Sequence, residues 1–219
     1  PNLNASFETS ALVIACNTAT ALAIHVLRQE FPALPIFGVE PAIKPAALQS
    51  RTHRIGVMAT AGTLGSAKFQ ELHRSLQDQA EFVLQSCDGL ADAIEQQWQQ
   101  SDDNTVLALC RKYLGAMGEF GTAAHQIDTV VLGCTHFPFF KAYLAQRIDE
   151  LMTHQAMGQV ALIDSGDAIA KRVHDLLEQA NQLASHKERP RLQFYATANL
   201  PTTEQAATRL LQRFLPELG

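Results

Sequence analysis

Residues 130–138 have the sequence Val130-Val131-Leu132-Gly133-Cys134-Thr135-His136-Phe137-Pro138. The apolar run predicts a buried strand, Gly133 is expected to allow a tight turn after it, and Phe137-Pro138 is typical of a helix start. In an open α/β sheet, ligands bind in the crevice outside the carboxyl ends of the strands. The thiol, hydroxyl and imidazole that follow Gly133 are therefore expected at a binding crevice.

A second segment repeats this pattern near the start of the chain. Residues 12–18, Leu-Val-Ile-Ala-Cys-Asn-Thr, again place a cysteine after an apolar strand and before a helical run that extends to Glu30. Aligning Cys16 with Cys134 sets Ala15 against Gly133. Two cysteines at equivalent strand ends of two similar halves can face each other across one cleft.

The rest of the chain alternates apolar strands with helical segments, which predicts an α/β fold with mainly parallel sheets. The repeated cysteine segment indicates two such lobes with the active site between them. The expected strands are residues 11–15, 36–39, 54–59, 81–85, 130–132, 160–163 and 192–196.

Composition excludes several classes of protein. The net charge of −5, with no basic run, argues against nucleic acid as a partner. No apolar stretch approaches the length needed to span a bilayer, so a membrane partner is not expected either. The four cysteines lack zinc-finger spacing, and reduced thiols in a cytoplasmic protein are the simplest interpretation.

The cysteines fall into two expected groups. Cys87 and Cys110 are predicted to be packed apolar side chains, the usual fate of a free cysteine. Cys16 and Cys134 are predicted to be functional, because a helix N-terminus lowers the pKa of a thiol and brings the thiolate within reach at neutral pH.

Four chemistries are compatible with Cys16 and Cys134. A redox pair is weakly supported because no Cys-x-x-Cys is present, and a metal site that includes His136 lacks an evident fourth ligand. Two-base proton transfer, in which one thiolate removes a proton and the opposite thiol delivers one, needs no cofactor. A cysteine hydrolase that pairs Cys134 with His136 leaves Cys16 unexplained. Helical periodicity alone predicts that Glu95 is a solvated charge.

Residues 15–19 (Ala-Cys-Asn-Thr-Ala) and 133–138 (Gly-Cys-Thr-His-Phe-Pro) resemble the two catalytic-cysteine motifs of the glutamate racemases of bacterial cell-wall synthesis. Residues 38–41 resemble the segment that links the two lobes in that family. Residues 59–66 resemble its A-T-x-G-T-x-x-S loop, and residues 163–166 resemble the entry to its late helix.

The resemblance implies an isomerase that interconverts L- and D-glutamate without a cofactor or metal, in the cytoplasm, and supplies D-glutamate for peptidoglycan and cell shape. It implies that Cys16 and Cys134 are the acid/base residues, assisted by His136 and Glu95. It leaves a homodimer open, as well as another two-cysteine racemase (for aspartate or a hydantoin) or a catalytically silent binding module. The residues expected to hold the substrate are Asn17, Thr18, Thr63, Thr135 and His136.

The resemblance also implies two Rossmann-like lobes related by a pseudo-twofold, with residues 1–41 and 155–219 in lobe one and residues 42–154 in lobe two. The family opens with a strand bearing Asp-Ser-Gly and a loop containing Tyr-Gly, and neither is found here. Residues 164–166, Asp-Ser-Gly, belong to the late helix and are not expected to replace that strand. We therefore expect a lobe one without its N-terminal strand, and weak or no turnover if the molecule lacks that segment.

Overall fold

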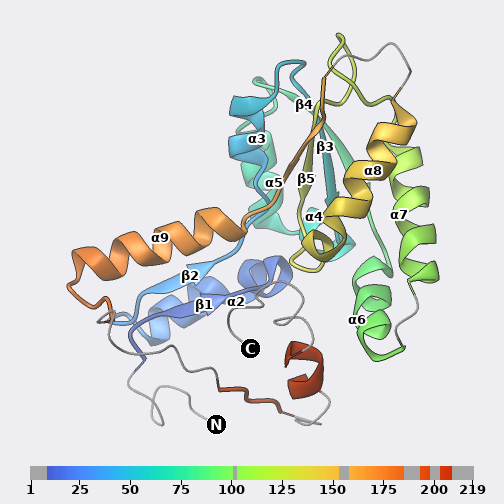
Figure 1. The fold of residues 1–219 in the computed structure, drawn as a ribbon. Helices are drawn as coiled ribbons and strands as arrows, with labels where there is room; N and C mark the ends of the chain where they lie inside the picture. Colours follow the sequence, from blue (N-terminus) through green and yellow to red (C-terminus); the bar gives the residue numbers. More distant parts are fainter. Residues whose placement is uncertain (1–8, 101–102, 153–157, 185–192, 198–202, 209–219) are drawn as a thin grey trace.

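The computed structural model describes residues 9–100, 103–152, 158–184, 193–197 and 203–208. Its strands form a four-stranded sheet in the order β4-β3-β5-β6 and a separate two-stranded sheet, β1-β2 (Figure 1). Each of the four strand pairings in these sheets is parallel, which confirms the predicted α/β class. The strands are β1 (Leu12–Ile14), β2 (Ile36–Gly38), β3 (Arg54–Ala59), β4 (Glu81–Ser86), β5 (Thr129–Leu132) and β6 (Ala161–Ile163).

Helices connect the strands, as parallel pairing requires. In Figure 1, α3 and α5 lie on one side of the four-stranded sheet and α7 and α8 on the other. The helices are α2 (Asn17–Glu30), α3 (Ile43–Gln49), α4 (Ala61–Leu64), α5 (Ala67–Arg74), α6 (Leu90–Gln100), α7 (Asn104–Ala116), α8 (Lys141–Leu151) and α9 (Gly166–Gln179), with a 3₁₀ turn η1 (Phe137–Phe140) before α8.

The core is built on the two faces of the four-stranded sheet. Successive side chains of a strand point to opposite faces, so Ile55 and Val57 of β3 join Val131 in the cluster beneath α3 and α5. Met58 and Val130 lie in the cluster on the other face, with residues of α6, α7, η1 and α8. Because β5 is covered on both faces, all four of its residues are buried. Cys134 therefore follows a strand whose position is fixed by packing on both sides.

The two-stranded sheet is held by α2. Arg28 Nη2 donates to the carbonyl oxygen of Ile36 at 2.8 Å. A Cβ atom on Gly38 would lie 2.3 Å from Thr20 Cγ2 and 2.6 Å from Ile24 Cδ1. Only glycine therefore lets α2 pack this closely on β2, and this packing places the start of α2, next to Cys16, beside the end of β1.

Three predicted boundaries differ from the structure. The predicted lobe-one segment began at residue 155 and so included β6, yet β6 pairs with β5 in the four-stranded sheet. The strand predicted over 192–196 was wrong, because residues 193–197 form no strand; Leu192 lies outside the described residues. The apolar periodicity of residues 168–184 predicts a helix over that range, but α9 ends at Gln179 and Asn181 has a positive φ of 55°.

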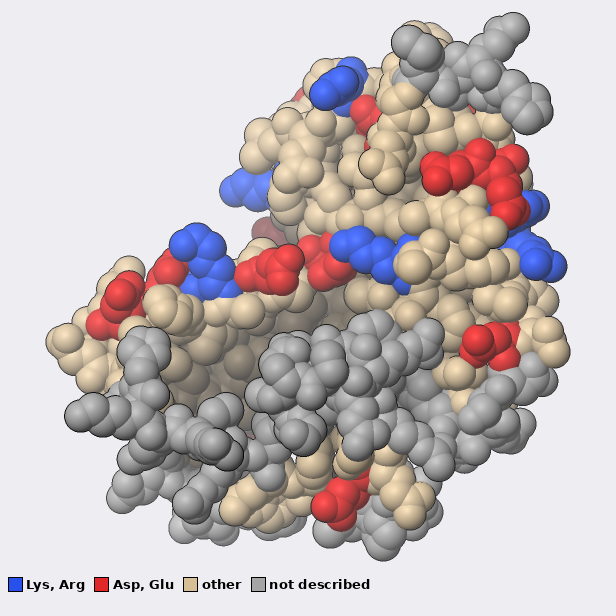
Figure 2. All heavy atoms as spheres, in the orientation of Figure 1, with Lys and Arg blue, Asp and Glu red and all other residues tan. Residues whose placement is uncertain are grey.

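Charged side chains of both signs are interspersed on the face shown in Figure 2. On α9, for example, Lys171 Nζ lies 3.3 Å from a carboxylate oxygen of Asp175. None of the helices in the described part of the chain combines the length and the hydropathy that crossing a membrane would demand.

Candidate active site

Cys134 follows β5 directly, and Gly133 brings the strand end close to β3. A Cβ atom on Gly133 would lie 3.0 Å from both the Met58 carbonyl oxygen and Ala59 Cβ. The glycine therefore allows close packing at the strand end, and its φ is not positive. The packing leaves the Cys134 side chain buried.

Cys134, His136 and Glu95 form a chain of polar contacts. Cys134 Sγ lies 3.6 Å from His136 Nδ1, and His136 Nε2 lies 2.7 Å from Glu95 Oε1. Because an ionised carboxylate only accepts hydrogen bonds, Nε2 carries the hydrogen in a neutral ring and Nδ1 is the acceptor that faces the thiol. Glu95 comes from α6, so three of the predicted catalytic residues lie together although 41 positions separate Glu95 from His136.

The protonation state of Cys134 differs from the sequence expectation. Burial raises the pKa of the Cys134 thiol, and the backbone N–H groups of His136 and Phe137 only partly oppose this effect. Negative charge on Cys16 and Glu95 raises the pKa further. The predicted lowering was therefore wrong for Cys134, because desolvation outweighs the local dipoles, and the group is a thiol at neutral pH.

Cys16 is the N-cap residue of α2, with an extended backbone (φ −153°, ψ 124°). Its side chain is exposed. Cys16 is close enough to Cys134 for its charge to raise the pKa of that thiol. The two cysteines of the repeat thus face a common region, one exposed and one buried.

Asn17 and Thr18 connect α2 to the four-stranded sheet. Asn17 is buried, and its Nδ2 donates to the Gly133 carbonyl oxygen at 3.0 Å. Thr18 Oγ1 lies 3.3 Å from Thr63 Oγ1 and 3.4 Å from Thr60 Oγ1. These contacts bring the predicted residues Asn17, Thr18 and Thr63 beside the ends of β3 and β5.

Thr60 was not predicted as a site residue. Its Oγ1 donates to Thr63 Oγ1 at 3.0 Å and accepts from the Thr63 backbone N–H at 3.2 Å, which caps α4. The signal was present in the sequence, because a threonine or serine immediately before a helix commonly caps it. The cap also fixes the orientation of the Thr63 hydroxyl.

A cavity of about 300 Å³ lies between the two sheets. Val13 and Asn17 line it from the two-stranded sheet and α2, and Cys134 and Thr135 line it from the end of β5. Residues 164–166, Asp-Ser-Gly, complete the wall. The local sequence does not predict this position, because it depends on β6 lying beside β5.

Asp164 is held in place on that wall. Lys141 Nζ lies 3.0 Å from its Oδ2, and the Gly166 backbone N–H donates to its Oδ1 at 3.0 Å. Burial alone would raise the pKa of Asp164, but these two partners outweigh it and hold the pKa below the usual value. Asp164 is therefore an ionised carboxylate, paired with Lys141, at neutral pH.

The fold and the site define a two-sheet α/β protein with a cysteine after the end of β1 and another after the end of β5, the second of which lines a cavity between the sheets. A family model described as Asp/Glu/Hydantoin racemase matches residues 2–173, and the chain belongs to this family.

Curated relatives agree with this assignment. The chain is 38% identical to the glutamate racemase of Pseudomonas syringae pv. tomato, over 87% of the chain and 63% of that relative. It is 41% identical to the glutamate racemase of Ectopseudomonas mendocina, over 80% of the chain and 61% of that relative. The chain thus spans about three fifths of the length of these curated relatives.

Solved structures show the same fold. The glutamate racemase isoform RacE1 from Bacillus anthracis matches with a TM-score of 0.74 at 26% identity, over 98% of this chain and 73% of that one. The Escherichia coli glutamate racemase in complex with L-glutamate and the activator UDP-MurNAc-Ala matches with a TM-score of 0.68 at 28% identity, over 96% of this chain and 73% of that one. The resemblance inferred from the two cysteine motifs is confirmed.

Proposed function

We propose that this protein racemises glutamate without a cofactor, with Cys16 and Cys134 as the two acid/base residues. The observation that carries the proposal is the Cys134–His136–Glu95 chain, next to a cavity that Asn17 lines from the neighbouring sheet. Relatives support glutamate as the substrate, since solved glutamate racemases from Escherichia coli and Francisella tularensis contain L-glutamate and D-glutamate respectively.

In one direction, the Cys16 thiolate removes the Cα proton, and the electron pair left on Cα delocalises into the carboxylate. The Cys134 thiol delivers its proton to the opposite face, which inverts the centre and leaves Cys16 as a thiol and Cys134 as a thiolate. The raised pKa of Cys134 suits its role as a donor.

The reverse direction requires Cys134 to lose its proton. His136 Nδ1 is placed to accept this proton, and Glu95 stabilises the resulting imidazolium at Nε2. A thiolate–imidazolium pair then serves as the base on this side. Without His136, burial would leave the Cys134 thiolate scarce at neutral pH.

The substrate is proposed to be held at its α-carboxylate and ammonium groups. Asn17 Oδ1 is buried without a hydrogen-bond partner among the described residues, so it is available to accept from an ammonium group. Thr18, Thr63 and Thr135 supply hydroxyl donors at the strand ends. Fixed donors of this kind stabilise the charge that develops during proton abstraction.

The test is deuterium incorporation at Cα of L- and D-glutamate in D₂O, followed by proton NMR. The wild-type chain is expected to exchange both isomers, and Cys16→Ser and Cys134→Ser are expected to abolish exchange or make it one-sided. Cys110→Ser, in the buried interior of α7, is the matched control and should leave exchange unchanged. Exchange that persists in both directions in Cys134→Ser would refute the two-thiol mechanism.

Two further assays address the substrate and the biological role. Aspartate and hydantoins, run in parallel with glutamate, should show no exchange; exchange with either of them alone would assign the protein to another branch of the family. We propose that the product serves peptidoglycan synthesis in the cytoplasm. Growth of a D-glutamate auxotroph that expresses this chain would support that role, and failure of an exchange-active chain to restore growth would contradict it.

A further inference from the structure

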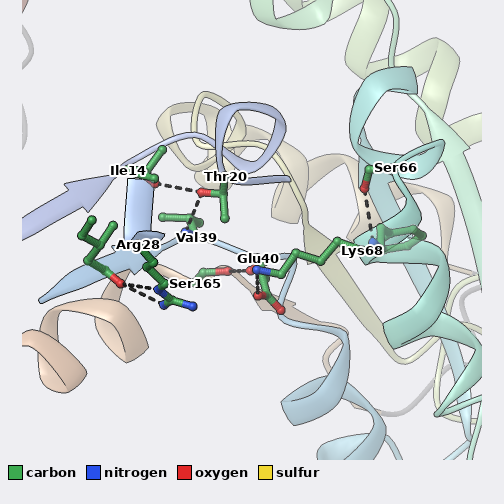
Figure 3. A network of polar contacts seen from close by, with 10 residues as sticks. Ile14, Thr20, Arg28, Val39, Glu40, Ser66, Lys68 and Ser165 are labelled. Carbon is green, nitrogen blue, oxygen red and sulfur yellow. Dashed lines mark hydrogen bonds and ion pairs between the residues drawn. The ribbon is translucent and has the colours of Figure 1, made fainter. Parts of the chain in front are cut away.

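Two connecting segments of the described chain lie between the two sheets, and these crossing segments contact each other. The first runs from β2 to α3 through residues 39–42, and the second runs from β6 to α9 through residues 164–165. Ser165 Oγ donates to the Glu40 carbonyl oxygen, which ties the crossings together (Figure 3). This contact adds to the Asn17–Gly133 hydrogen bond in holding the two sheets relative to one another.

A lysine of α5, the helix packed on the four-stranded sheet, also forms an ion pair with Glu40. Lys68, on α5, extends its Nζ to within 2.6 Å of Glu40 Oε1 (Figure 3). α5 is itself fixed, because Phe69 is buried in the cluster beneath the sheet and its backbone N–H donates to Ser66 Oγ at 3.2 Å. The ion pair therefore joins a rigid helix to the crossing segment.

On its other side, the crossing segment is attached to the strand that precedes Cys16. The Val39 N–H donates to Thr20 Oγ1 at 3.1 Å, and the Thr20 hydroxyl donates to the Ile14 carbonyl oxygen at 3.2 Å. Ile14 is the last residue of β1, two positions before Cys16. A shift of residues 39–40 would therefore move β1 and α2 together.

We propose that Lys68 and Glu40 form a positioning pair that sets the placement of Cys16 relative to Cys134. The inference rests on the proposed function for its catalytic meaning and on the contacts above for its geometry. Both side chains are partly exposed, and exposed ion pairs contribute little to overall stability. Loss of the pair should change the separation of the two thiols without unfolding the chain.

The chain offers a closely matched control. Arg147 Nη1 and Glu150 Oε2 lie 2.7 Å apart with side chains 29% and 48% exposed, against 2.6 Å and 27% and 43% for Lys68 and Glu40. The control pair lies within one helix, α8, and does not link the two sheets. Lys68→Met and Arg147→Met therefore remove similar ion pairs, of which only the first connects the sheets.

The experiment measures thiol separation directly with a series of bifunctional maleimides of graded length. Cys16 and Cys134 are the targets, at a pH where both react, because Cys87 and Cys110 are almost fully buried. The wild-type chain should favour one linker length. Lys68→Met should reduce that product about two- to fivefold, the range for a partly exposed ion pair, and increase the longer products. The charge-swapped double variant Lys68→Glu/Glu40→Lys should restore the wild-type profile.

An unchanged linker profile in Lys68→Met, or an equal change in Arg147→Met, would overturn the proposal. In kinetic assays, Lys68→Met is expected to lower kcat by about the same factor, two- to fivefold, with little change in KM. The reason is that the pair affects the geometry of proton transfer more than the binding of substrate. If the wild-type chain shows no Cα exchange, the proposed function fails while the linker profile still decides the positioning role. If exchange is normal and the profile does not respond, only the positioning role fails.

Discussion

The two strand–cysteine segments share a sequence pattern but occupy different surroundings. β5 is covered on both faces, with Val131 fully buried, whereas Val13 at the matching position of β1 is 40% exposed. Each cysteine is buried or exposed like the strand that precedes it, since Cys134 is buried and Cys16 is exposed. The comparison shows that a repeated local sequence places a cysteine after each strand. Packing by helices far along the chain then decides the pKa of the Cys134 thiol and how much each strand contributes to stability.

The largest expected effect comes from placing a charge at the two matched valines. Val131→Asp should lower the free energy of unfolding by more than about 4 kcal/mol, because an unpaired carboxylate would be buried between two apolar clusters. Val13→Asp should lower it by less than about 1 kcal/mol, since the new side chain reaches solvent. Urea denaturation followed by circular dichroism measures both. Equal losses would mean that β1 is as well covered as β5 in solution.

A second difference is the anchor at the start of β5. Asp128 accepts from Ser50 Oγ at 2.6 Å, from the backbone N–H groups of Arg51 and Thr52 at 2.7 and 3.0 Å, and from Thr129 Oγ1 at 3.0 Å. These bonds join the turn before β3 to β5. Asp128→Asn should lower the free energy of unfolding by about 2–3 kcal/mol, because an amide replaces an acceptor that faces only donors. Denaturation at pH 7 measures the loss.

The same carboxylate predicts a pH dependence. Burial would raise the pKa of Asp128, but its hydrogen bonds outweigh burial and hold the pKa below the usual value. The unfolded chain therefore takes up this proton first as pH falls, so the contribution is complete above the unfolded pKa, about 3.9, and is lost as pH drops through the folded pKa. Asp128→Asn should lack this part of the acid sensitivity. A variant with the wild-type pH profile would show that other groups dominate.

Gly133 and Ala15 occupy aligned positions in the two strand–cysteine segments. Substitutions at these positions compare the packing of the two strand ends, with smaller expected losses of stability. Gly133→Ala should lower the free energy of unfolding by about 1–3 kcal/mol, because the new methyl group would press against the Met58 carbonyl oxygen and Ala59. Ala15 is exposed, so Ala15→Gly should cost no more than about 1 kcal/mol, through backbone entropy alone. Thermal melts of the two variants measure both losses of stability. A neutral Gly133→Ala would mean that the ends of β3 and β5 can separate easily.

Much of this fold followed from local signals in the sequence. The apolar runs of β3 and β5 predicted their positions to within a residue, because buried central strands have near-continuous apolar sequences. The family resemblance raised Glu95 above a solvated charge, and the structure places its Oε1 2.7 Å from His136 Nε2. Helical periodicity alone could not have placed Glu95 beside His136, since that contact depends on how α6 packs against η1.

The failures of prediction share a cause in long-range packing. The sequence of β6 does not indicate which sheet it joins, because a short apolar strand pairs equally well with either. The sign of the Cys134 pKa shift depended on burial by residues far along the chain, which a local rule about helix N-termini does not include. The cavity-lining position of residues 164–166 followed from the placement of β6.

The last prediction concerns thiol reactivity, which should separate the two cysteines without any substitution. Iodoacetamide reacts with the thiolate, so the exposed Cys16 should be alkylated well before the buried Cys134 at pH 8. Because the pKa of Cys134 is raised, the pH midpoint of its alkylation should lie above that of an ordinary cysteine. Burial raises the pKa values of Cys87 and Cys110 to about 12, so both should remain unmodified until the chain unfolds.

Peptide mass spectrometry as a function of pH measures each cysteine separately, and Glu95→Gln sharpens the result. Removing that negative charge should lower the Cys134 midpoint and leave the rate at Cys16 unchanged, because the charge of Glu95 raises the pKa of the Cys134 thiol. A higher midpoint would instead mean that Glu95 acts mainly by stabilising the His136 imidazolium. A Cys134 midpoint below that of an ordinary thiol would show that the strand-end dipoles outweigh burial. The two halves of the repeat would then be chemically alike, and the asymmetry between β1 and β5 would concern stability alone.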